Sequence, residues 1–482
     1  MDAAALPSAL PPGWESWPPD WDESADVIVI GSGFAGLAAA MEARLAGATV
    51  IVLEKMRACG GNSIIAGGLF AAAGTPLQKR LGVTDSADSL YADMLRAGLG
   101  LNHRDLARMV AEQSADVLRW TIDDLGVQYQ DRVIQLGGHS VPRTHITANR
   151  SGSLIIRRQL ARVKGLDIPI RLGACFQRLL RGPDGRVRGV LICDDYRYGR
   201  GASGTFRYLQ AHAAVILATG GFANDLTLRT AQDPRLTADV DTTAKRSTTG
   251  EGLREALRIE GMPVHLDWIQ FASWTSPDER GEGVGGPFAD MAFRDGLIVD
   301  PSTAKRCVNE LGDRRTVADA LWAAGRPCIC LADAGALARS NLQIERALRK
   351  GVVRQFDSLT DLSAAFSVRE DVLHDSVERY NMAVMAGVDA EFGKPFFPGV
   401  APLDHRPYYA MRLWPKVHHT MGGVQINAQA QVLDLEQRPI PGLYAAGEVT
   451  GGIHGACRLG SCAMPECLIF GRIAGRNAAR LC

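Results

Sequence analysis

The clearest pattern of apolar and polar positions lies close to the N-terminus. Residues 26–30 begin with an aspartate and continue as an unbroken apolar run, as expected of a strand buried in a parallel sheet. The glycine-rich stretch 31–36 comes next, and the Ala- and Leu-rich segment after it predicts a helix that ends near Ala46. Residues 49–53 predict a second strand, which closes in Glu54. Together these segments predict one β-α-β unit.

The middle of the chain shows other patterns. Apolar residues at helical spacing between positions 102 and 125 predict amphipathic helices. Between 168 and 209, short apolar stretches alternate with turn signals such as Pro-Asp-Gly at 183–185, which predicts a β-meander. Residues 213–218 predict another buried strand, which runs into a pair of glycines.

The segment from about residue 271 to 417 differs in character from what precedes it. It opens with the glycine-rich run 281–286, has helical stretches near 318–324 and 368–387, and contains no nucleotide fingerprint. Because Gly-Glu at 447–448 and the final helix return to the first pattern, we interpret this segment as an insertion. The sequence therefore predicts an α/β fold with three parts: an N-terminal arm (1–23), a Rossmann-like cofactor-binding domain (24–270 and 418–482) and an inserted α+β capping domain (271–417).

Length and charge narrow the function classes. A chain of 482 residues is too long for one ordinary core, and Lys plus Arg equals Asp plus Glu at 53 each, so no global charge favours nucleic acid or a membrane surface. No apolar run is long enough to span a bilayer. The first 23 residues are rich in Pro and Trp and lack the basic start and apolar run of a signal peptide, which predicts an arm lying on the surface.

The ten cysteines show no metal or haem pattern. Cys328 and Cys330 are separated by one residue, and Cys457, Cys462 and Cys467 recur every five, whereas zinc and iron–sulfur sites use other spacings. We expect reduced, mostly buried thiols, no metal site and a cytoplasmic protein.

The glycines of residues 31–36 form a nucleotide fingerprint in its full context. Gly31, Gly33 and Gly36 follow a predicted strand and open a predicted helix, and the next strand ends in Glu54. Glycines let the backbone approach a pyrophosphate, which then lies at the helix N-terminus, and the carboxylate takes the ribose hydroxyls. The alternative, which the full context disfavours, is a tight strand–helix turn that binds nothing.

Imidazoles and a guanidinium embedded in glycine mark the C-terminal part of the chain. His-His-Thr-Met-Gly-Gly stands at 418–423, Gly-Glu at 447–448 and Gly-Gly-Ile-His-Gly-Ala-Cys-Arg-Leu-Gly at 451–460. Such a set brings hydrogen-bond donors with little bulk to a planar cofactor and an anionic substrate. From about residue 25 to 480, pattern and order resemble the flavoprotein subunits of the fumarate reductase and succinate dehydrogenase family, most closely its soluble flavocytochrome c-type members.

The resemblance implies FAD as the cofactor. It adds a second glycine loop, residues 59–63 with 67–68, beneath the isoalloxazine ring, and further flavin contacts. Since that loop carries no histidine, we expect non-covalent binding. The residues expected to bind FAD are Gly31, Gly33, Phe34, Ala35, Gly36, Glu54, Lys55, Gly60, Gly61, Asn62, Ser63, Gly67, Gly68, Ala218, Thr219, Gly220, Glu251, His419, Gly447, Glu448, Arg458, Gly460, Ala463 and Met464.

The resemblance also implies catalytic residues. Arg458 and His418 match an arginine and a histidine that hold one substrate carboxylate. The proton donor of the family is an arginine four residues after an Asn-Glu pair, which here is Arg314, although the adjacent Arg315 is the alternative if the motif is out of phase. Preorganised cations of this kind stabilise the charge that develops on the substrate. Structural roles are the favoured interpretation for His139, His145 and His454.

The chain departs from the dicarboxylate reductases in one region. Residues 271–274 contain no histidine, and 288–293 replace a Thr-Glu-x-x-Arg-Gly run, so the far carboxylate of fumarate loses its partners. We therefore expect fumarate to be disfavoured. Asp290 is expected to hold a nitrogen-bearing or hydroxylated end and Trp274 to stack on a ring, an arrangement similar to urocanate reductases; alternatively, both residues are ordinary packing and surface.

The expected activity is an FAD-dependent reduction, or in reverse formation, of a C=C bond conjugated to a carboxylate or carbonyl, by hydride transfer and protonation from arginine. One alternative is a 3-ketosteroid-type FAD dehydrogenase, which the histidine and arginine set argues against; another is a non-catalytic redox-sensing flavoprotein. Besides its small-molecule substrate, the protein needs an electron partner, either a separate protein, free reduced flavin or a quinone-linked partner. No nucleic-acid partner is expected.

Overall fold

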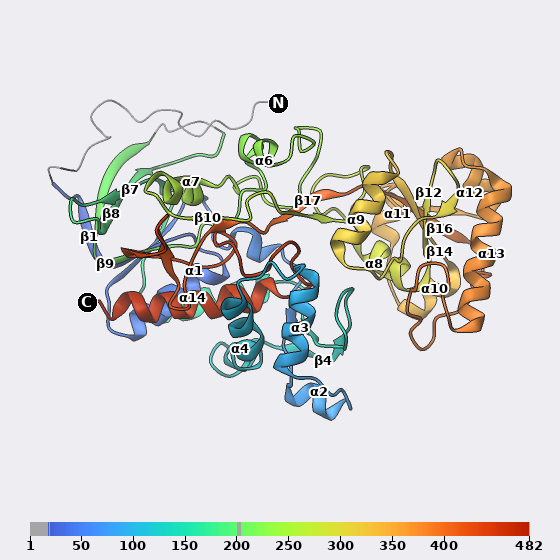
Figure 1. Cartoon of the computed structure of the whole chain (residues 1–482), viewed down its shortest axis with the longest axis horizontal. Helices are drawn as coiled ribbons and strands as arrows, with labels where there is room; N and C mark the ends of the chain where they lie inside the picture. The colour runs from blue at the N-terminus through green and yellow to red at the C-terminus, as the bar shows by residue number, and fades with distance from the viewer. Residues whose placement is uncertain (1–17, 19, 200–203, 482) are drawn as a thin grey trace. The chain divides into compact units, whose positions relative to one another are not determined.

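The computed structural model describes residue 18 and residues 20–199 and 204–481 (Figure 1). Most of the expected N-terminal arm, residues 1–17 and 19, therefore lies outside the described residues. The chain forms two compact units. The first takes in the described residues up to Thr237, Lys245–Ile269 and everything from His419 onward; the second comprises Ala238–Ala244 and Gln270–His418.

The first unit is built on a mainly parallel sheet, as the sequence predicts. Strand β1 lies between β2 and β9 with parallel register on both sides. The order across the sheet is β19-β20-β9-β1-β2-β6. All residues of β2 and the last four of β1 are buried, because helices cover such sheets on both faces. The strand bounds are β1 (Glu23–Ile30), β2 (Val50–Glu54), β6 (Ile170–Leu172), β9 (Thr205–Leu217), β19 (Gln431–Leu433) and β20 (Pro439–Ala445).

Strand β9 joins two parts that the sequence pattern separates. Its first residues pair antiparallel with β8 (Val187–Asp194), which pairs in turn with β7 (Cys175–Arg181) to give the expected meander. Its last residues pair in parallel with β1 and β20. The buried strand expected at 213–218 is thus the end of β9, not a separate element. No glycine or proline interrupts Thr205–Leu217, so nothing ends the strand where its burial changes from alternating to continuous.

Two long helices pack closely in this unit. Helix α1 (Phe34–Leu45) and helix α14 (Ala463–Ala479) lie side by side (Figure 1). A Cβ added to Gly471 would lie 2.4 Å from the carbonyl oxygen of Ala35, and one added to Gly475 would lie 2.2 Å from that of Ala39. The small residues therefore let the two backbones touch, which places the start of α1 beside the middle of α14.

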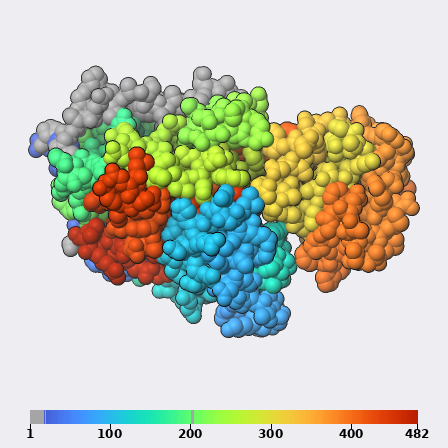
Figure 2. Space-filling model, in the orientation of Figure 1, coloured from blue at the N-terminus to red at the C-terminus, as the bar shows by residue number. Residues whose placement is uncertain are grey.

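The remaining elements of the first unit surround this core. Residues 102–125, expected to contain more than one amphipathic helix, form the single long helix α4, which packs against α3; Figure 2 shows this part of the chain in blue as one continuous surface. The helices are η1 (Gly61–Ile64), α2 (Pro76–Arg80), α3 (Ala87–Ala97), α4 (Arg104–Asp123), α5 (Ser153–Gly165), α6 (Leu226–Gln232) and α7 (Glu251–Arg258). The strands are β3 (Leu69–Ala71), β4 (Tyr129–Ile134), β5 (Thr144–Thr147), β10 (Pro263–Val264) and β18 (Gly423–Val424).

The second unit is an antiparallel sheet with helices, as expected of an inserted α+β domain. Its sheet has the order β13-β12-β14-β16-β15, and the chain enters and leaves the unit through β11 (Ile269–Ala272) and β17 (Lys416–Thr420). The strands are β12 (Leu297–Asp300), β13 (Lys305–Arg306), β14 (Cys328–Asp333), β15 (Arg354–Phe356) and β16 (Tyr408–Leu413). The helices are α8 (Gly286–Asp295), α9 (Arg314–Ala323), α10 (Ala334–Ser340), α11 (Glu345–Arg349), α12 (Leu359–Phe366) and α13 (Glu370–Ala386). Over the described part of the chain, no helix has the length and apolar character needed to cross a bilayer.

Candidate active site

The glycines of the fingerprint make a cradle that no side chain can enter. Gly31 has a φ of +107°, and a Cβ there would lie 2.3 Å from the carbonyl oxygen of Ala218. A Cβ on Gly36 would lie 2.0 Å from the carbonyl oxygen of Gly31, so the third glycine of the fingerprint serves the packing of α1 against the turn. The turn between β1 and α1 therefore leaves room for a ligand.

The N-terminus of α1 offers hydrogen-bond donors to that ligand. Gly33 is the N-cap residue and has no side chain to cap the helix; the hydroxyl of Ser63 accepts a hydrogen bond from the amide of Phe34 at 3.0 Å. No acidic residue lies in the first turn. Unpaired amides and the helix dipole therefore favour an anion such as a pyrophosphate here.

Glu54 ends β2 beside the cradle, as predicted. Its carboxylate accepts a hydrogen bond from the hydroxyl of Ser32 at 2.5 Å and one from the amide of Met56 at 2.9 Å. The same hydroxyl accepts a hydrogen bond from the amide of Gly60 at 3.0 Å. Ser32, which the sequence analysis did not single out, thus joins the nucleotide fingerprint to the start of the second glycine loop.

A pocket with about 880 Å³ of empty space, part of it open to solvent, runs from this cradle through the first unit. The expected cofactor residues that line it are Gly31, Gly33, Phe34, Ala35, Glu54, Lys55, Gly61, Asn62, Ser63, Ala218, Thr219, Gly220, Glu251, Gly447 and Glu448. Lining residues that sequence reasoning missed are Ile30, Ser32, Leu53, Ala174, Phe176, Ser247, Thr248, Ala446 and Cys467.

Three contacts hold the segment 245–251 against Lys55 and Asn62. The side-chain amide of Asn62 donates to the hydroxyl of Thr248 at 3.0 Å, and its oxygen accepts from the amide of Lys245 at 2.8 Å. The ammonium of Lys55 lies 2.6 Å from the carboxylate of Glu251. The charges of this lysine and glutamate compensate each other, so both shape the wall of the pocket.

The other expected cofactor residues lie around these walls. A Cβ on Gly68 would lie 2.1 Å from the hydroxyl of Thr147, which explains the glycine structurally; Gly67 precedes it. Gly460, Ala463 and Met464 lie at and just before the start of α14.

The residues present fit FAD. The glycine cradle and the uncapped start of α1 suit a dinucleotide's pyrophosphate, and the pocket continues past it to Gly447 and Glu448. Within the described residues, the buried hydroxyl of Thr219 in the pocket wall has no hydrogen-bond partner, as expected of a group that a ligand satisfies. Glu54 would hold the ribose hydroxyls at one end of the pocket, and the flavin ring would lie near Glu448 at the other.

Gly31→Ala should weaken FAD binding by at least about tenfold, since a Cβ 2.3 Å from the carbonyl oxygen of Ala218 forces the turn of the cradle to move, and a tenfold loss corresponds to only about 1.4 kcal/mol. Gly47→Ala is the matched control, because Gly47 has a similar φ of +101° but no atom within 4 Å of an added Cβ. Fluorescence titration of the apoproteins with FAD measures both. An equal loss in the two variants would mean that backbone strain alone, and not the cradle, explains the effect.

Charged and imidazole side chains gather where the pocket reaches Glu448. Burial raises the pKa of the Glu448 carboxyl, while the amide of Thr420, which donates to it at 3.0 Å, and the nearby Arg458 act in the opposite direction. Nδ1 of His419 lies 3.5 Å from the same carboxylate. The guanidinium of Arg458 is buried, and burial lowers its pKa. The first unit thus holds a buried cation beside a buried carboxyl at this end of the pocket.

His454 belongs to the same cluster. Its ring lies 6.2 Å from that of His419, and burial, together with Arg458, lowers its pKa to about 3, so the imidazole is neutral. In the part of the chain that the structure describes, the buried Nε2 of His454 has no hydrogen-bond partner. The structural role expected for this histidine therefore leaves one ring nitrogen unused.

Glu466 is a member of this region that sequence reasoning missed. It lies on α14, and the thiol of Cys467 donates to its carboxylate at 3.4 Å. Burial, with a contribution from Glu448, raises its pKa to about 8. Nothing in the local pattern distinguishes it from other glutamates on helices; only the packing of α14 shows that it is buried.

The second unit brings together three other predicted residues. The guanidinium of Arg314 lies over the ring of Trp274 at 4.5 Å, and the ring of His418 meets that of Trp274 edge-on at 4.9 Å. Nη1 of Arg314 donates to the side-chain oxygen of Gln270 at 3.2 Å, and Nδ1 of His418 lies 2.7 Å from the hydroxyl of Thr243. The expected proton donor and one expected carboxylate ligand therefore share an aromatic neighbour.

The N-terminus of α9 distinguishes Arg314 from Arg315. Asp313 is the N-cap residue and its carboxylate accepts from the amides of Arg315 and Thr316 at 3.0 and 3.1 Å. This cap fixes the first turn, so that Arg315 pairs with Asp319 at 3.3 Å along the partly exposed side of the helix, while Arg314 meets Trp274. The glutamate of the Asn-Glu pair, Glu310, lies four residues before Arg314 and is held in a buried salt bridge with Arg306.

The sequence did not predict that this salt bridge and the glycine-rich run hold the segments of Arg314 and Trp274 in place. Arg306 contacts Glu310 through two hydrogen bonds of 2.8 Å, and Lys394 lies 3.2 Å from the same carboxylate. In the glycine-rich run, the carboxylate of Glu279 accepts from the amides of Val284 and Gly285 at 2.7 and 2.8 Å. These contacts fix the segments that carry Arg314 and Trp274.

The indole of Trp274 is fixed by one further contact, because its N–H donates to the carboxylate of Glu282 at 2.7 Å. Asp290, the other residue expected at the far end of the substrate, lies on α8 and is exposed. Phe288 and Phe293 of the same segment are buried in the core of the second unit. The segment 288–293 therefore turns apolar side chains inward.

Comparisons with known proteins identify relatives that match nearly the whole chain. The chain matches the family model of the FAD binding domain over residues 26–464. It is 42% identical over 463 residues to the acrylate reductase flavoprotein subunit of Shewanella woodyi, covering 95% of this chain and 91% of that protein. It is 31% identical over 464 residues to the urocanate reductase of Eggerthella lenta, covering 95% and 75%. The open conformation of a flavocytochrome c3 fumarate reductase superposes with a TM-score of 0.77 at 32% identity, covering 95% and 79%.

The matches extend over nearly the whole chain. They confirm the expected cofactor and the expected α/β fold. This protein therefore belongs to the FAD-binding flavoproteins of the fumarate reductase and succinate dehydrogenase family, whose named members reduce carbon–carbon double bonds.

Proposed function

We propose that this protein reduces the C=C bond of a small α,β-unsaturated monocarboxylate of the acrylate type. The observation that carries the proposal is the contact of Arg314 with the face of Trp274, whose edge meets His418. Trp274 belongs to the segment 271–274, which lacks the histidine that the resemblance leads us to expect for the far carboxylate of a dicarboxylate. The 42% identity to an acrylate reductase subunit supports the same substrate class.

Each cationic residue has a role in the proposed reaction. When bound, FAD supplies the hydride. The fork of Arg458 binds the substrate carboxylate through paired hydrogen bonds, and its burial strengthens that attraction. His418, held by Thr243, donates to the same carboxylate and stabilises the charge that accumulates at that end of the substrate. Arg314 delivers a proton to the α-carbon, which completes the reduction.

The cost of desolvating a second carboxylate distinguishes monocarboxylate from dicarboxylate substrates. The first carboxylate has Arg458 and His418, but a second beside Trp274 would lose water without gaining a comparable partner. Leaving a buried charge unpaired costs about 3–5 kcal/mol. We therefore expect acrylate-type monocarboxylates to exceed fumarate in kcat/KM by at least about tenfold, since part of this cost is relieved by water that follows the charge.

The test follows reoxidation of the photoreduced flavin under anaerobic conditions with acrylate, crotonate, cinnamate, urocanate and fumarate. Acrylamide is the matched control, because it keeps the vinyl group and lacks the carboxylate; it should react slowly. Fast reoxidation by fumarate would contradict the proposed pocket. Fast reoxidation by acrylamide would show that no carboxylate is recognised, and reoxidation by none of the compounds would exclude the proposed reaction.

A further inference from the structure

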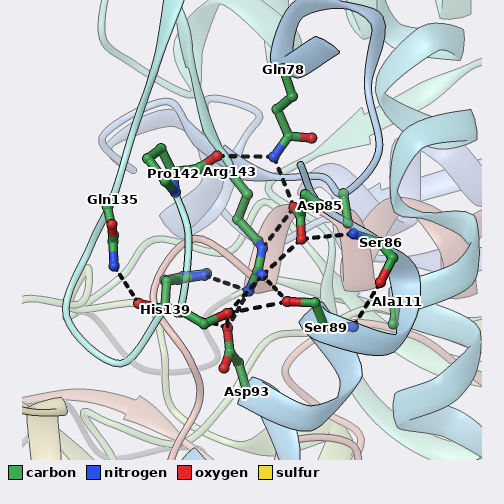
Figure 3. A network of polar contacts seen from close by, with 12 residues as sticks. Gln78, Asp85, Ser86, Ser89, Asp93, Ala111, Gln135, His139, Pro142 and Arg143 are labelled. Carbon is green, nitrogen blue, oxygen red and sulfur yellow. Dashed lines mark hydrogen bonds and ion pairs between the residues drawn. The ribbon is translucent and has the colours of Figure 1, made fainter. Parts of the chain in front are cut away.

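A buried ionic network in the first unit takes no part in the proposed reaction. Its centre is Arg143, whose side chain is fully buried (Figure 3). The guanidinium meets Asp85 through two hydrogen bonds of 3.0 and 2.9 Å, and Nη1 also contacts Asp93. The outer oxygen of Asp93 lies 2.8 Å from Arg96. Two arginines and two aspartates therefore compensate one another, so the network is rigid without a net charge.

The network determines which nitrogen of His139 carries the proton. Nη1 of Arg143 lies 3.3 Å from Nδ1 of His139, and Figure 3 shows the ring turned toward the guanidinium. A guanidinium only donates hydrogen bonds, so Nδ1 accepts and is unprotonated. Burial lowers the pKa of this imidazole to about 4, which keeps it neutral at physiological pH. The proton of the neutral ring is therefore on Nε2.

Nε2 of His139 faces the turn that follows Arg458. It lies 2.9 Å from the carbonyl oxygen of Gly460, to which it donates. The next residue, Ser461, has a φ of +59°, a left-handed conformation that a serine adopts only when its surroundings hold it. The hydroxyl of Ser461 lies 2.8 Å from that of Thr144, and its carbonyl accepts from the amide of Ala71 at 3.0 Å. The turn is thus fastened from the side on which the Arg143 network lies.

We propose that His139 is a positioning residue for substrate binding. Its Nε2–H, oriented by Arg143, holds the Gly460 carbonyl and thereby sets the buried Arg458 guanidinium in the direction that the substrate carboxylate requires. This inference rests on the proposed role of Arg458. The bond spans 321 residues of sequence, and it connects the Gly-Gly-His-Ser-Val-Pro-Arg-Thr-His stretch at 137–145 to the C-terminal motif.

Two substitutions of His139 by amide residues test its two hydrogen bonds, to Gly460 and to Arg143, one at a time. His139→Gln places an N–H₂ near the position of Nε2 and keeps the bond to Gly460, whereas His139→Asn keeps a partner for Arg143 and loses that bond. We expect His139→Asn to raise the dissociation constant for acrylate about tenfold or more, because a buried carbonyl left without its donor no longer holds the turn that carries Arg458. The dissociation constant of His139→Gln for acrylate should stay within about threefold of the wild-type value, because the bond to Gly460 is kept.

His145→Gln is the matched control. This histidine is also buried, and its Nε2 lies 3.0 Å from the hydroxyl of Thr75, away from the Gly460 turn. Binding is measured by the change in the oxidised flavin spectrum, and hydrogen exchange of the peptide spanning residues 456–463 is followed by mass spectrometry. Faster exchange in His139→Asn, but not in His139→Gln or His145→Gln, supports the proposal even if no substrate turns over.

The outcomes separate this inference from the proposed function. Equal exchange and equal acrylate affinity in His139→Asn and the wild type would overturn the positioning role. Equal loss in the Asn, Gln and control variants would also overturn it, because the effect would then be a general loss of packing. If the wild type binds no unsaturated acid, the proposed function fails, and the exchange experiment still decides whether His139 holds the turn.

Discussion

Arg314→Gln should lower the rate of acrylate reduction by about 10³- to 10⁴-fold while FAD stays bound, at the upper end of what a positioned proton donor contributes. Glutamine keeps a polar group within reach of Gln270 but has no proton to deliver to carbon. The aromatic face of Trp274 holds the wild-type guanidinium 4.5 Å from its ring, so the donor is preorganised and its loss is not made up by water. Anaerobic stopped-flow reoxidation measures the rate, and absorbance measures the flavin content.

Arg315→Gln is the control for that experiment. Arg315 is the next residue on α9, and its contact with Asp319 at 3.3 Å lies on a partly exposed helix surface, where such pairs contribute about 0–1 kcal/mol. Its removal should leave the rate unchanged. A large loss in Arg315→Gln with a small one in Arg314→Gln would show that the motif is out of phase and that the assignment of the donor is wrong.

Arg458→Met should lower kcat/KM for acrylate by about 10²- to 10³-fold, since removing one partner of a desolvated charge pair costs about 3–5 kcal/mol. Methionine has a similar length and fills the buried space without a charge. The slow reaction with acrylamide, which has no carboxylate to bind, should change little. The ratio of the two rates, measured in the same preparation, therefore reports on carboxylate recognition and not on general damage to the site.

Arg458→Lys gives a graded comparison, because it keeps the charge and loses the planar fork. We expect it to fall between the wild type and Arg458→Met in its rate with acrylate. If all three proteins keep the same preference for acrylate over acrylamide, the carboxylate is bound elsewhere. FAD content again has to be measured, because Arg458 is also expected to contact the cofactor.

The features of this molecule that could be predicted from its sequence are those encoded in contiguous motifs. The motif of Gly31, Gly33 and Gly36 is contiguous, because strand, turn and helix follow one another, although the atom nearest to an added Cβ on Gly31 belongs to the distant Ala218. The family resemblance, the cofactor and the α/β fold all rest on such stretches, and all three are confirmed. Continuous strands such as β9 are harder to predict, since a change from alternating to complete burial looks like two elements.

Residues that matter only through tertiary packing were missed. Ala174 and Phe176 line the cofactor pocket from β7, and Cys467 lines it from α14, yet none belongs to a motif. Which of Arg314 and Arg315 lies over Trp274 depends on Asp313, which caps the helix, and the family motif alone does not show this. Likewise, the structure supplies the contact between Trp274 and Arg314, whereas the sequence offered only an aromatic residue in place of an expected histidine. The roles proposed for these side chains remain predictions for the experiments above.

The parallel sheet around β9 constrains how this protein is made. β9 takes its place between β1, from the start of the chain, and β20, which ends at Ala445. A ribosome must therefore pass Ala445 before the sheet can close, whereas residues 238–418, which contain the whole second unit, have by then been synthesised. Because domains generally fold as units during synthesis, the inserted unit is complete first. We expect a nascent chain arrested between His418, the end of the second unit, and β20 to carry that unit folded. Such a chain lacks β20 and the pocket residues Gly447 and Glu448, so it should not bind FAD.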